Sequence, residues 1–264
     1  MCDGLDPIAR ALVTGRDWDY LDMSSPSAFL PALRASTAEL LSSLSGSAWS
    51  SAEVAAPSLC DGWTRGHVLT HIARNADGIA DTIAGALRGE VVERYPGGWE
   101  ARNLAIAAGA GRPFSELVSD VRDSAARLDS VFDDVRSADA WMLPTTEEQT
   151  PSTWVYRRWR EVLVHHVDLA ASYTPDQWPP LFVSTELGEA ASSLTERVTD
   201  GAVRVRVTAE GSGASDYLGA EWTAGSGSPV DVSGPDWAVL AWLTGRGSVV
   251  SSVLSGTATL GKWR

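Results

Sequence analysis

Residues 154–173 read WVYRRWREVLVHHVDLAASY, and most of the fold prediction starts from this stretch. Its apolar residues recur at helical spacing, and four of its ionisable residues form one stripe at i, i+3 or i+4 separation: Arg158, Glu161, His165 and Asp168. A helix exposed to solvent would show a broad polar face instead. A narrow ionisable seam therefore predicts a helix inside a bundle, where the polar groups pair with one another or bind a metal.

A second stretch, residues 61–76 with the sequence DGWTRGHVLTHIARNA, has the same character. Thr64 is a suitable N-cap for a helix about two dozen residues long. His67, His71 and Asn75 share one seam of this helix, and all four histidines of the chain lie in the two stretches. Two imidazoles and one carboxylate from two helices predict a three-ligand metal site. A buried histidine–glutamate hydrogen-bond network without metal is the alternative.

The residue types also indicate which metal and which chemistry to expect. Zn²⁺ suits two imidazoles and one carboxylate, and a fourth position stays open to water, substrate or a thiol. A coordinated thiol loses its proton and becomes a nucleophile. Asp168 or a backbone carbonyl is expected to orient a ligand imidazole. His166 points away from the seam and is expected to be structural, and Cys60 is expected to be a small buried residue with no base beside it.

The rest of the chain predicts an α domain followed by a small α+β domain. Four main helices fit an up-down bundle over residues 26–175, after an extension of uncertain order at residues 1–25. TPDQWPP, residues 174–180, is interpreted as a linker. Residues 180–264 then combine helical segments with alternating, strand-like segments, the last of which leads into a helix ended by Gly245 or Gly247.

Composition narrows the class of partner. The 264 residues carry a net charge of −13. The chain therefore lacks the excess of cationic side chains that binding to nucleic acid or to an anionic membrane requires. No apolar run approaches the ~20 residues of a membrane span, and the N-terminus does not look like a secretory signal. Two cysteines do not make a disulfide framework. We expect a cytoplasmic monomer whose partners are small molecules.

Arg246 stands between two glycines in TGRG, at the end of a predicted helix. One interpretation is a favourable charge at a helix C-terminus. The other is a guanidinium that binds an anion and is presented to the bundle.

Three separated motifs together resemble a known family. They are DGWTRGHVLTHIARNA at residues 61–76, RRWREVLVHHVDLAA at 157–171 and LTGRGS at 243–248. In order and spacing they resemble mycothiol-dependent maleylpyruvate isomerases, which are DinB-like metalloenzyme bundles of actinobacteria. The resemblance runs from about residue 28 to the C-terminus, and it implies a DinB-like four-helix bundle with a small α+β C-terminal domain.

The resemblance also implies roles for individual residues. By analogy with the family, zinc would be held by His71, Glu161 and His165, and Arg246 would take part in catalysis. Three further positions carry the residue that the family tends to have there: His67, Asn75 and Asp168. Together with Arg158 they are candidates for supporting the metal ligands. The residues that would bind mycothiol are not indicated.

The function that the resemblance implies is a zinc- and mycothiol-dependent cis–trans isomerase. It would act on a conjugated cis-enone acid by reversible thiolate addition, as in the conversion of maleylpyruvate to fumarylpyruvate. Two alternatives stay open. One is a mycothiol S-transferase that conjugates an electrophile in detoxification or natural-product biosynthesis. The other is a non-catalytic DinB-like protein that binds a small molecule.

Overall fold

The computed structural model describes residues 27–209 and 217–263, and these form two compact units that divide after Ser172. Each unit is described by itself. The extension expected at residues 1–25, which includes Cys2, lies outside the described residues. Within the described ranges, no helix has both the length and the apolar character that a membrane span requires.

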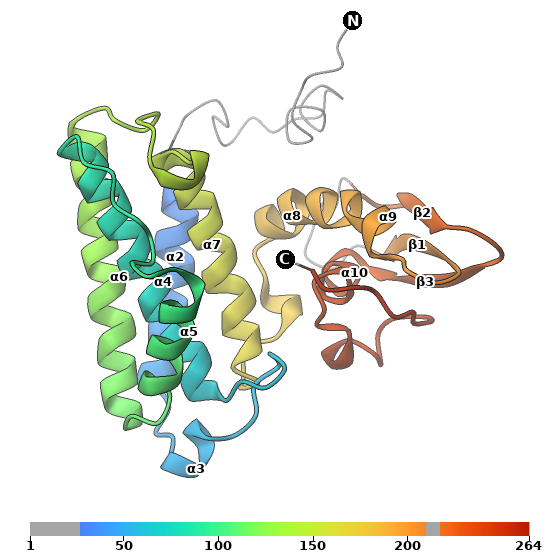
Figure 1. The fold of residues 1–264 in the computed structure, drawn as a ribbon. Coiled ribbons are helices and arrows are strands. Elements are labelled where there is room, and N and C mark those ends of the chain that lie inside the picture. Colours follow the sequence, from blue (N-terminus) through green and yellow to red (C-terminus); the bar gives the residue numbers. More distant parts are fainter. Residues whose placement is uncertain (1–26, 210–216, 264) are drawn as a thin grey trace, which may run out of the picture. The chain divides into compact units, whose positions relative to one another are not determined.

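The first unit is built on four long helices (Figure 1). They are α2 (Leu30–Ser45), α4 (Arg65–Leu87), α6 (Phe114–Ser137) and α7 (Pro151–Asp168). Helices α4 and α2 each pack against both α6 and α7, so the four share one core. Three shorter elements join them: α3 (Ser51–Val54), α5 (Gly98–Gly109) and the 3₁₀ helix η1 (Thr146–Glu148). The predicted four-helix bundle is confirmed.

Helix α4 begins where the sequence predicts it and is closely covered along one side. The Thr64 side chain accepts a hydrogen bond from the His67 backbone N–H, which caps the first turn. A Cβ at Gly66 would lie 2.0 Å from the Ala110 carbonyl oxygen, and a Cβ at Gly78 would lie 2.6 Å from that of Arg94. Glycine at these positions therefore lets the chain on either side of α5 pack directly on the α4 backbone.

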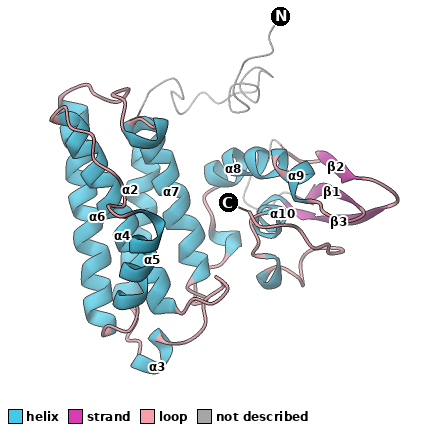
Figure 2. Ribbon diagram, viewed as in Figure 1, coloured by secondary structure: helices cyan, strands magenta, loops and turns pink. Residues whose placement is uncertain are grey.

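The second unit combines helices with a three-stranded sheet (Figure 2). Its elements are η2 (Pro175–Gln177), α8 (Pro180–Ser192), α9 (Leu194–Arg197), β1 (Ala202–Ala209), β2 (Glu221–Gly225), β3 (Pro229–Pro235), α10 (Asp236–Leu243) and η3 (Gly247–Val249). The strand order is β2-β1-β3, with β1 antiparallel to β2 and parallel to β3. Helix α10 packs on α8 and on the sheet. The expected small α+β fold is confirmed.

Two details of this unit differ from the sequence prediction. Residues 174–180, expected to be a linker, belong to the unit itself, because Trp178 is 1% exposed and its ring meets that of Phe182 at 5.5 Å. Alternation in YLGAEW, residues 217–222, predicts a strand, but the strand begins only at Glu221, since Gly219 has a φ of +78° and belongs to a turn.

Candidate metal centre

Three side chains from two helices bring their donor atoms together in the first unit. His71 Nε2, on α4, lies 2.8 Å from Glu161 Oε2 and 3.0 Å from His165 Nε2, both on α7. The remaining pair, His165 Nε2 and Glu161 Oε2, is 3.3 Å apart. The structure thus unites the three residues that the family resemblance implied as metal ligands.

The donor set fits a divalent cation. Two imidazole nitrogens and one carboxylate oxygen are a usual ligand set for zinc with an open fourth position. Donors at about 2.1 Å from a tetrahedral ion stand roughly 3.4 Å from one another. The observed separations of 2.8, 3.0 and 3.3 Å are slightly shorter than that. The three groups would need to spread by only about half an ångström to hold such an ion.

The ionisable groups of this cluster influence one another strongly. Burial lowers the pKa of His71 to about 4, so its ring is neutral at pH 7. Desolvation would raise the pKa of Glu161, but hydrogen bonds with His165 and His71 outweigh it and hold that pKa well below its ordinary value. Desolvation likewise opposes protonation of His165, yet hydrogen bonds to acidic neighbours, Asp168 first, raise its pKa well above the usual value.

Asp168 orients one of the imidazoles. Its Oδ2 accepts a hydrogen bond of 2.8 Å from His165 Nδ1, and the residue is completely buried. In the neutral form that a metal would ligate, this hydrogen bond keeps the proton on Nδ1, so that the Nε2 lone pair faces the donor cluster. Carboxylate–histidine pairs of this kind are common behind metal ligands. The orienting role expected for Asp168 agrees with this geometry.

Cys60 differs from its expectation. It is partly exposed, and its Sγ donates a 3.2 Å hydrogen bond to Asp168 Oδ2. The expectation of a buried residue with no base beside it was therefore wrong. The loop that carries Cys60 is tied to the end of α7, because the Leu59 N–H donates to the Asp168 carbonyl and Arg65 Nη2 donates to the Ala170 carbonyl.

Three other candidate residues, His67, Arg158 and Asn75, form hydrogen bonds that stabilise helices α4 and α7 around the donor cluster. His67 Nδ1 accepts from the Thr64 N–H at 3.2 Å, so this ring completes the cap of its own helix. Arg158 Nη1 donates to the Ile72 carbonyl and to Asn75 Oδ1, each at 2.8 Å, which joins α7 to α4 one turn beyond His71.

His166, by contrast, faces α2, where its Nε2 lies 2.7 Å from Ser43 Oγ. This contact agrees with the structural role expected for the residue. The histidine therefore joins α7 to α2, away from the donor cluster.

Arg102 was missed by the sequence analysis. Its Nη2 lies 2.8 Å from His71 Nδ1, and its guanidinium is surrounded by the rings of Trp63, Tyr95 and Trp99. The residue stands in the short helix α5, whose apolar pattern is weak and gives no functional signal. The one available sign was that Arg102 is the only cation in GWEARNLAIAAG.

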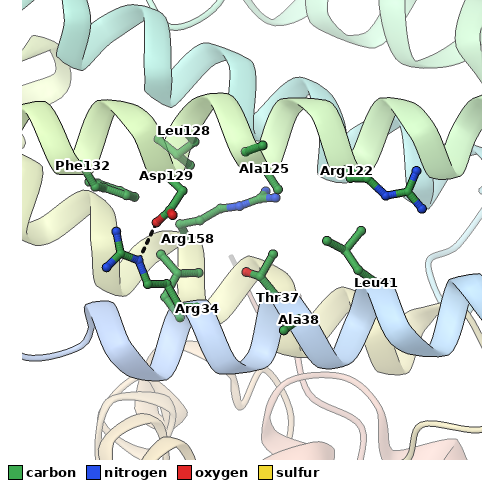
Figure 3. A pocket seen from close by; sticks show the side chains of 12 residues that line it. Arg34, Thr37, Ala38, Leu41, Arg122, Ala125, Leu128, Asp129, Phe132 and Arg158 are labelled. Carbon is green, nitrogen blue, oxygen red and sulfur yellow. Dashed lines mark hydrogen bonds and ion pairs between the residues drawn. The ribbon is translucent and has the colours of Figure 1, made fainter.

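A separate cavity of about 340 Å³ lies between α2 and α6 (Figure 3). Arg158 from α7 borders it, and an ion pair of 2.6 Å between Arg34 and Asp129 stands on its wall. None of the three clustered donors lines this cavity. It is therefore a different feature of the bundle from the candidate metal centre.

Arg246 belongs to the second unit. The chain beyond α10 turns at Gly245, which has a φ of +88°, so the helix ends at one of the two glycines expected to end it. Arg246 Nη1 donates to the Thr244 carbonyl, and the guanidinium carbon lies 6.0 Å from the centroid of the Trp263 ring. Its role toward the donor cluster stays a prediction.

Comparison with known proteins adds the family. A family model described as the mycothiol maleylpyruvate isomerase N-terminal domain matches residues 30–170. The fold is similar to two crystal structures of the mycothiol-dependent maleylpyruvate isomerase, one of them of a histidine-to-alanine mutant. In each case the TM-score is 0.74 at 26% sequence identity, covering 90% of this chain and 97% of that one. None of the curated proteins compared with the chain matches it significantly.

Proposed function

The chain belongs to the mycothiol maleylpyruvate isomerase family, and on that premise we propose that it is a mycothiol-dependent enzyme that isomerises a conjugated cis-enone acid such as maleylpyruvate. The observation that carries the proposal is the convergence of His71, Glu161 and His165 on one point, within 3.3 Å of one another. Burying polar side chains costs free energy, so three of them would not be expected to converge in a helical bundle if their only role were packing.

We propose zinc as the ion that these residues would hold. When bound, it would keep the sulfur of mycothiol as a thiolate and orient it. Asp168 holds the His165 ring in position through Nδ1, so this ligand needs no reorientation to bind. Glu161 supplies the negative charge of the ligand set, and its low pKa keeps it ionised at pH 7.

The chemistry of the substrate then follows from its conjugation. The electron-poor alkene gains a carbon–sulfur bond, and its double bond becomes a single bond while negative charge moves to the conjugated carbonyl oxygen. Rotation about the single bond follows. Loss of the sulfur restores the double bond in the trans form and returns the thiolate unchanged. We propose that Arg246 stabilises the enolate charge or binds a carboxylate of the substrate.

The direct test combines metal identification with turnover. Protein purified without metal treatment is expected to contain zinc by mass spectrometry, and it should convert many equivalents of maleylpyruvate with one equivalent of mycothiol. Stoichiometric consumption of the thiol would instead indicate an S-transferase. Protein that contains no zinc and does not take it up would contradict the metal site.

Variants identify the ligands. His71→Ala, Glu161→Ala and His165→Ala are each expected to lose both metal and turnover, because a three-ligand site does not tolerate the loss of one ligand. His67→Ala is the matched control, since that ring caps the same helix and is not among the three clustered donors. The ligand assignment would be wrong if the His67 variant lost zinc while the His71 variant retained it.

A further inference from the structure

Arg102 is held at the edge of the donor cluster by aromatic rings. Its guanidinium carbon lies 5.2 Å from the ring centroid of Trp99, 5.5 Å from that of Tyr95 and 5.9 Å from that of Trp63. Aromatic faces attract the cation without occupying its N–H groups. The guanidinium is thereby positioned 2.8 Å from His71, and the rings themselves take up none of its N–H donors.

No carboxylate neutralises this cation within the described part of the chain. Arg102 donates to Asn103 Oδ1 and contacts His71 Nδ1, and its buried Nε has no hydrogen-bond partner. Other arginines of this unit do form ion pairs with carboxylates: Arg74 and Arg112 with Asp120, Arg94 with Glu147, and Arg127 with Asp81. In a protein with 34 acidic residues, an arginine left without one beside a polar cluster is suited to bind an external anion.

The contact with His71 cannot persist when a metal binds. A guanidinium has only donors, so His71 Nδ1 must accept, and the ring proton must then be on Nε2, facing Glu161. A metal ligated by Nε2 needs the lone pair there, which places the proton on Nδ1 of the neutral ring. Two donors would then face each other. Metal binding therefore releases the Nη2 donor of Arg102.

We propose that Arg102 binds a carboxylate of the electrophile, and that metal binding at His71 frees it for this contact. The identity of the electrophile rests on the proposed function, whose substrate class carries a carboxylate. The contact would fix the position of the alkene relative to the metal-held thiol. Arg102 is thus assigned as a substrate-binding residue in the first unit, distinct from Arg246 in the second.

The test uses the zinc-loaded full chain and maleate, a cis-dicarboxylate, without thiol. Wild-type protein is expected to bind maleate in isothermal calorimetry, and Arg102→Met should weaken that binding at least tenfold, because a charge-assisted hydrogen bond is lost. Arg102→Lys should recover part of the affinity, since it restores the charge without the forked geometry. Neutral maleamide should bind equally to wild type and Arg102→Met.

The control is Arg112→Met, which removes a cation already paired with Asp120 at 2.5 Å. This variant is expected to bind maleate as wild type does. The proposal is overturned if wild type does not bind maleate, or if Arg102→Met binds it unchanged. It is also overturned if Arg112→Met and Arg102→Met lose affinity for maleate equally, because removal of any positive charge would then weaken binding and no specific contact would be needed.

Zinc affinity provides a second readout that does not depend on substrate. Arg102→Met should bind zinc at least as tightly as wild type in competition with a chromophoric chelator. In wild type the hydrogen bond from Arg102 stabilises the metal-free tautomer of His71, and the variant lacks this hydrogen bond. Weaker zinc binding would show that Arg102 supports the ligand and would overturn the release step. Maleate binding that depends on Arg102, in a protein that does not isomerise maleylpyruvate, would refute the proposed function and leave this inference standing.

Discussion

Asp168 determines how one imidazole is presented to the donor cluster. The residue is fully buried, and the same oxygen, Oδ2, accepts from His165 Nδ1 at 2.8 Å and from Cys60 Sγ at 3.2 Å. A partner of this kind fixes the tautomer of a ligand histidine and raises its basicity. The position of Asp168 therefore affects metal affinity even though it lies behind the donors.

Asp168→Asn is expected to weaken zinc binding by roughly 10- to 100-fold while the bundle stays folded, because the neutral amide is a weaker acceptor for His165 Nδ1–H. Competition with a chelator measures the affinity, and circular dichroism checks the fold. Asp123→Asn, an exposed position on α6, is the control and should bind zinc as wild type does. Unchanged affinity in Asp168→Asn would show that the carboxylate has no orienting role.

Residue-level prediction from the sequence succeeded where spacing within one helix carries the information. Glu161 and His165 are four positions apart on α7, so their shared face was visible without a structure. Cys60 was misjudged because its partner Asp168 lies 108 positions away in the chain. Arg102 was missed because its neighbours come from three segments, and only folding brings Trp63, Tyr95 and His71 around it.

At the scale of single elements, the glycine residues of α4 determine which segments can pack beside the donor cluster. The backbone at Gly78 is covered by the Arg94 carbonyl, and the next residue, Tyr95, contributes a ring against Arg102. Two effects oppose each other at this position. Alanine favours the helix by about 1 kcal/mol over glycine, but forced overpacking costs about 1–3 kcal/mol.

Because a Cβ at Gly78 would stand 2.6 Å from a backbone oxygen, we expect the steric effect to dominate. Gly78→Ala should lower the free energy of unfolding by about 1 kcal/mol or more in denaturant titrations. Gly111→Ala, where no atom lies within 4 Å of the added Cβ, should leave stability nearly unchanged. A stabilised Gly78→Ala protein would mean that the Arg94 segment yields easily.

The contact between α7 and α2 should make stability depend on pH. His166 is 3% exposed, lies 2.7 Å from Ser43 Oγ, and has its pKa lowered by burial from 6.5 to about 4. Above pH 6.5 the ring is neutral in both folded and unfolded chains. Between pH 6.5 and 4 only the unfolded chain takes up the proton, so stability falls as the pH decreases, by on the order of 3 kcal/mol over the whole interval.

Denaturant titrations of wild type and His166→Gln at pH 7 and pH 5 test this dependence. The variant should lose less stability than wild type on acidification, because glutamine does not titrate. Equal losses in the two proteins would assign the acid sensitivity to other groups. Both measurements should use the same metal content, since ligand binding also contributes to stability.

Caps and apolar periods located helices from the sequence, but the period alone did not fix both ends, since α7 spans Pro151–Asp168 rather than residues 154–173. The Thr64 cap placed the start of α4, and apolar periodicity located α7. Residues 174–180 were misinterpreted because proline-rich composition suggests a linker, whereas burial of Trp178 depends on partners distant in sequence. Strand β2 begins later than alternation alone predicts, because the positive φ of Gly219 belongs to a turn.

At the scale of the whole molecule, the three clustered donors and Arg246 belong to different units. Arg246→Met is expected to retain full zinc, because every proposed ligand lies in the first unit. It should lower kcat by about 10²- to 10³-fold if the guanidinium stabilises developing charge. Metal analysis and steady-state kinetics of the same preparation separate the two effects.

Arg204→Met is the matched control for Arg246, since Arg204 is a β1 residue that lies 3.4 Å from Asp231 and 3.7 Å from Glu221. It should retain both zinc and turnover. Loss of zinc in Arg246→Met would indicate a structural role, and full activity would remove Arg246 from the reaction.

His71 and Glu161 are 90 positions apart along the chain, so one ion shared between them would close a very long loop. An ion that binds only the native state increases its stability by RT ln(1 + [M]/Kd), about 2.7 kcal/mol at a hundredfold excess over Kd. The melting temperature should therefore rise with free zinc and fall after dialysis against a chelator. Cellular metal supply would then regulate how much of the protein survives proteolysis, in addition to how fast it works.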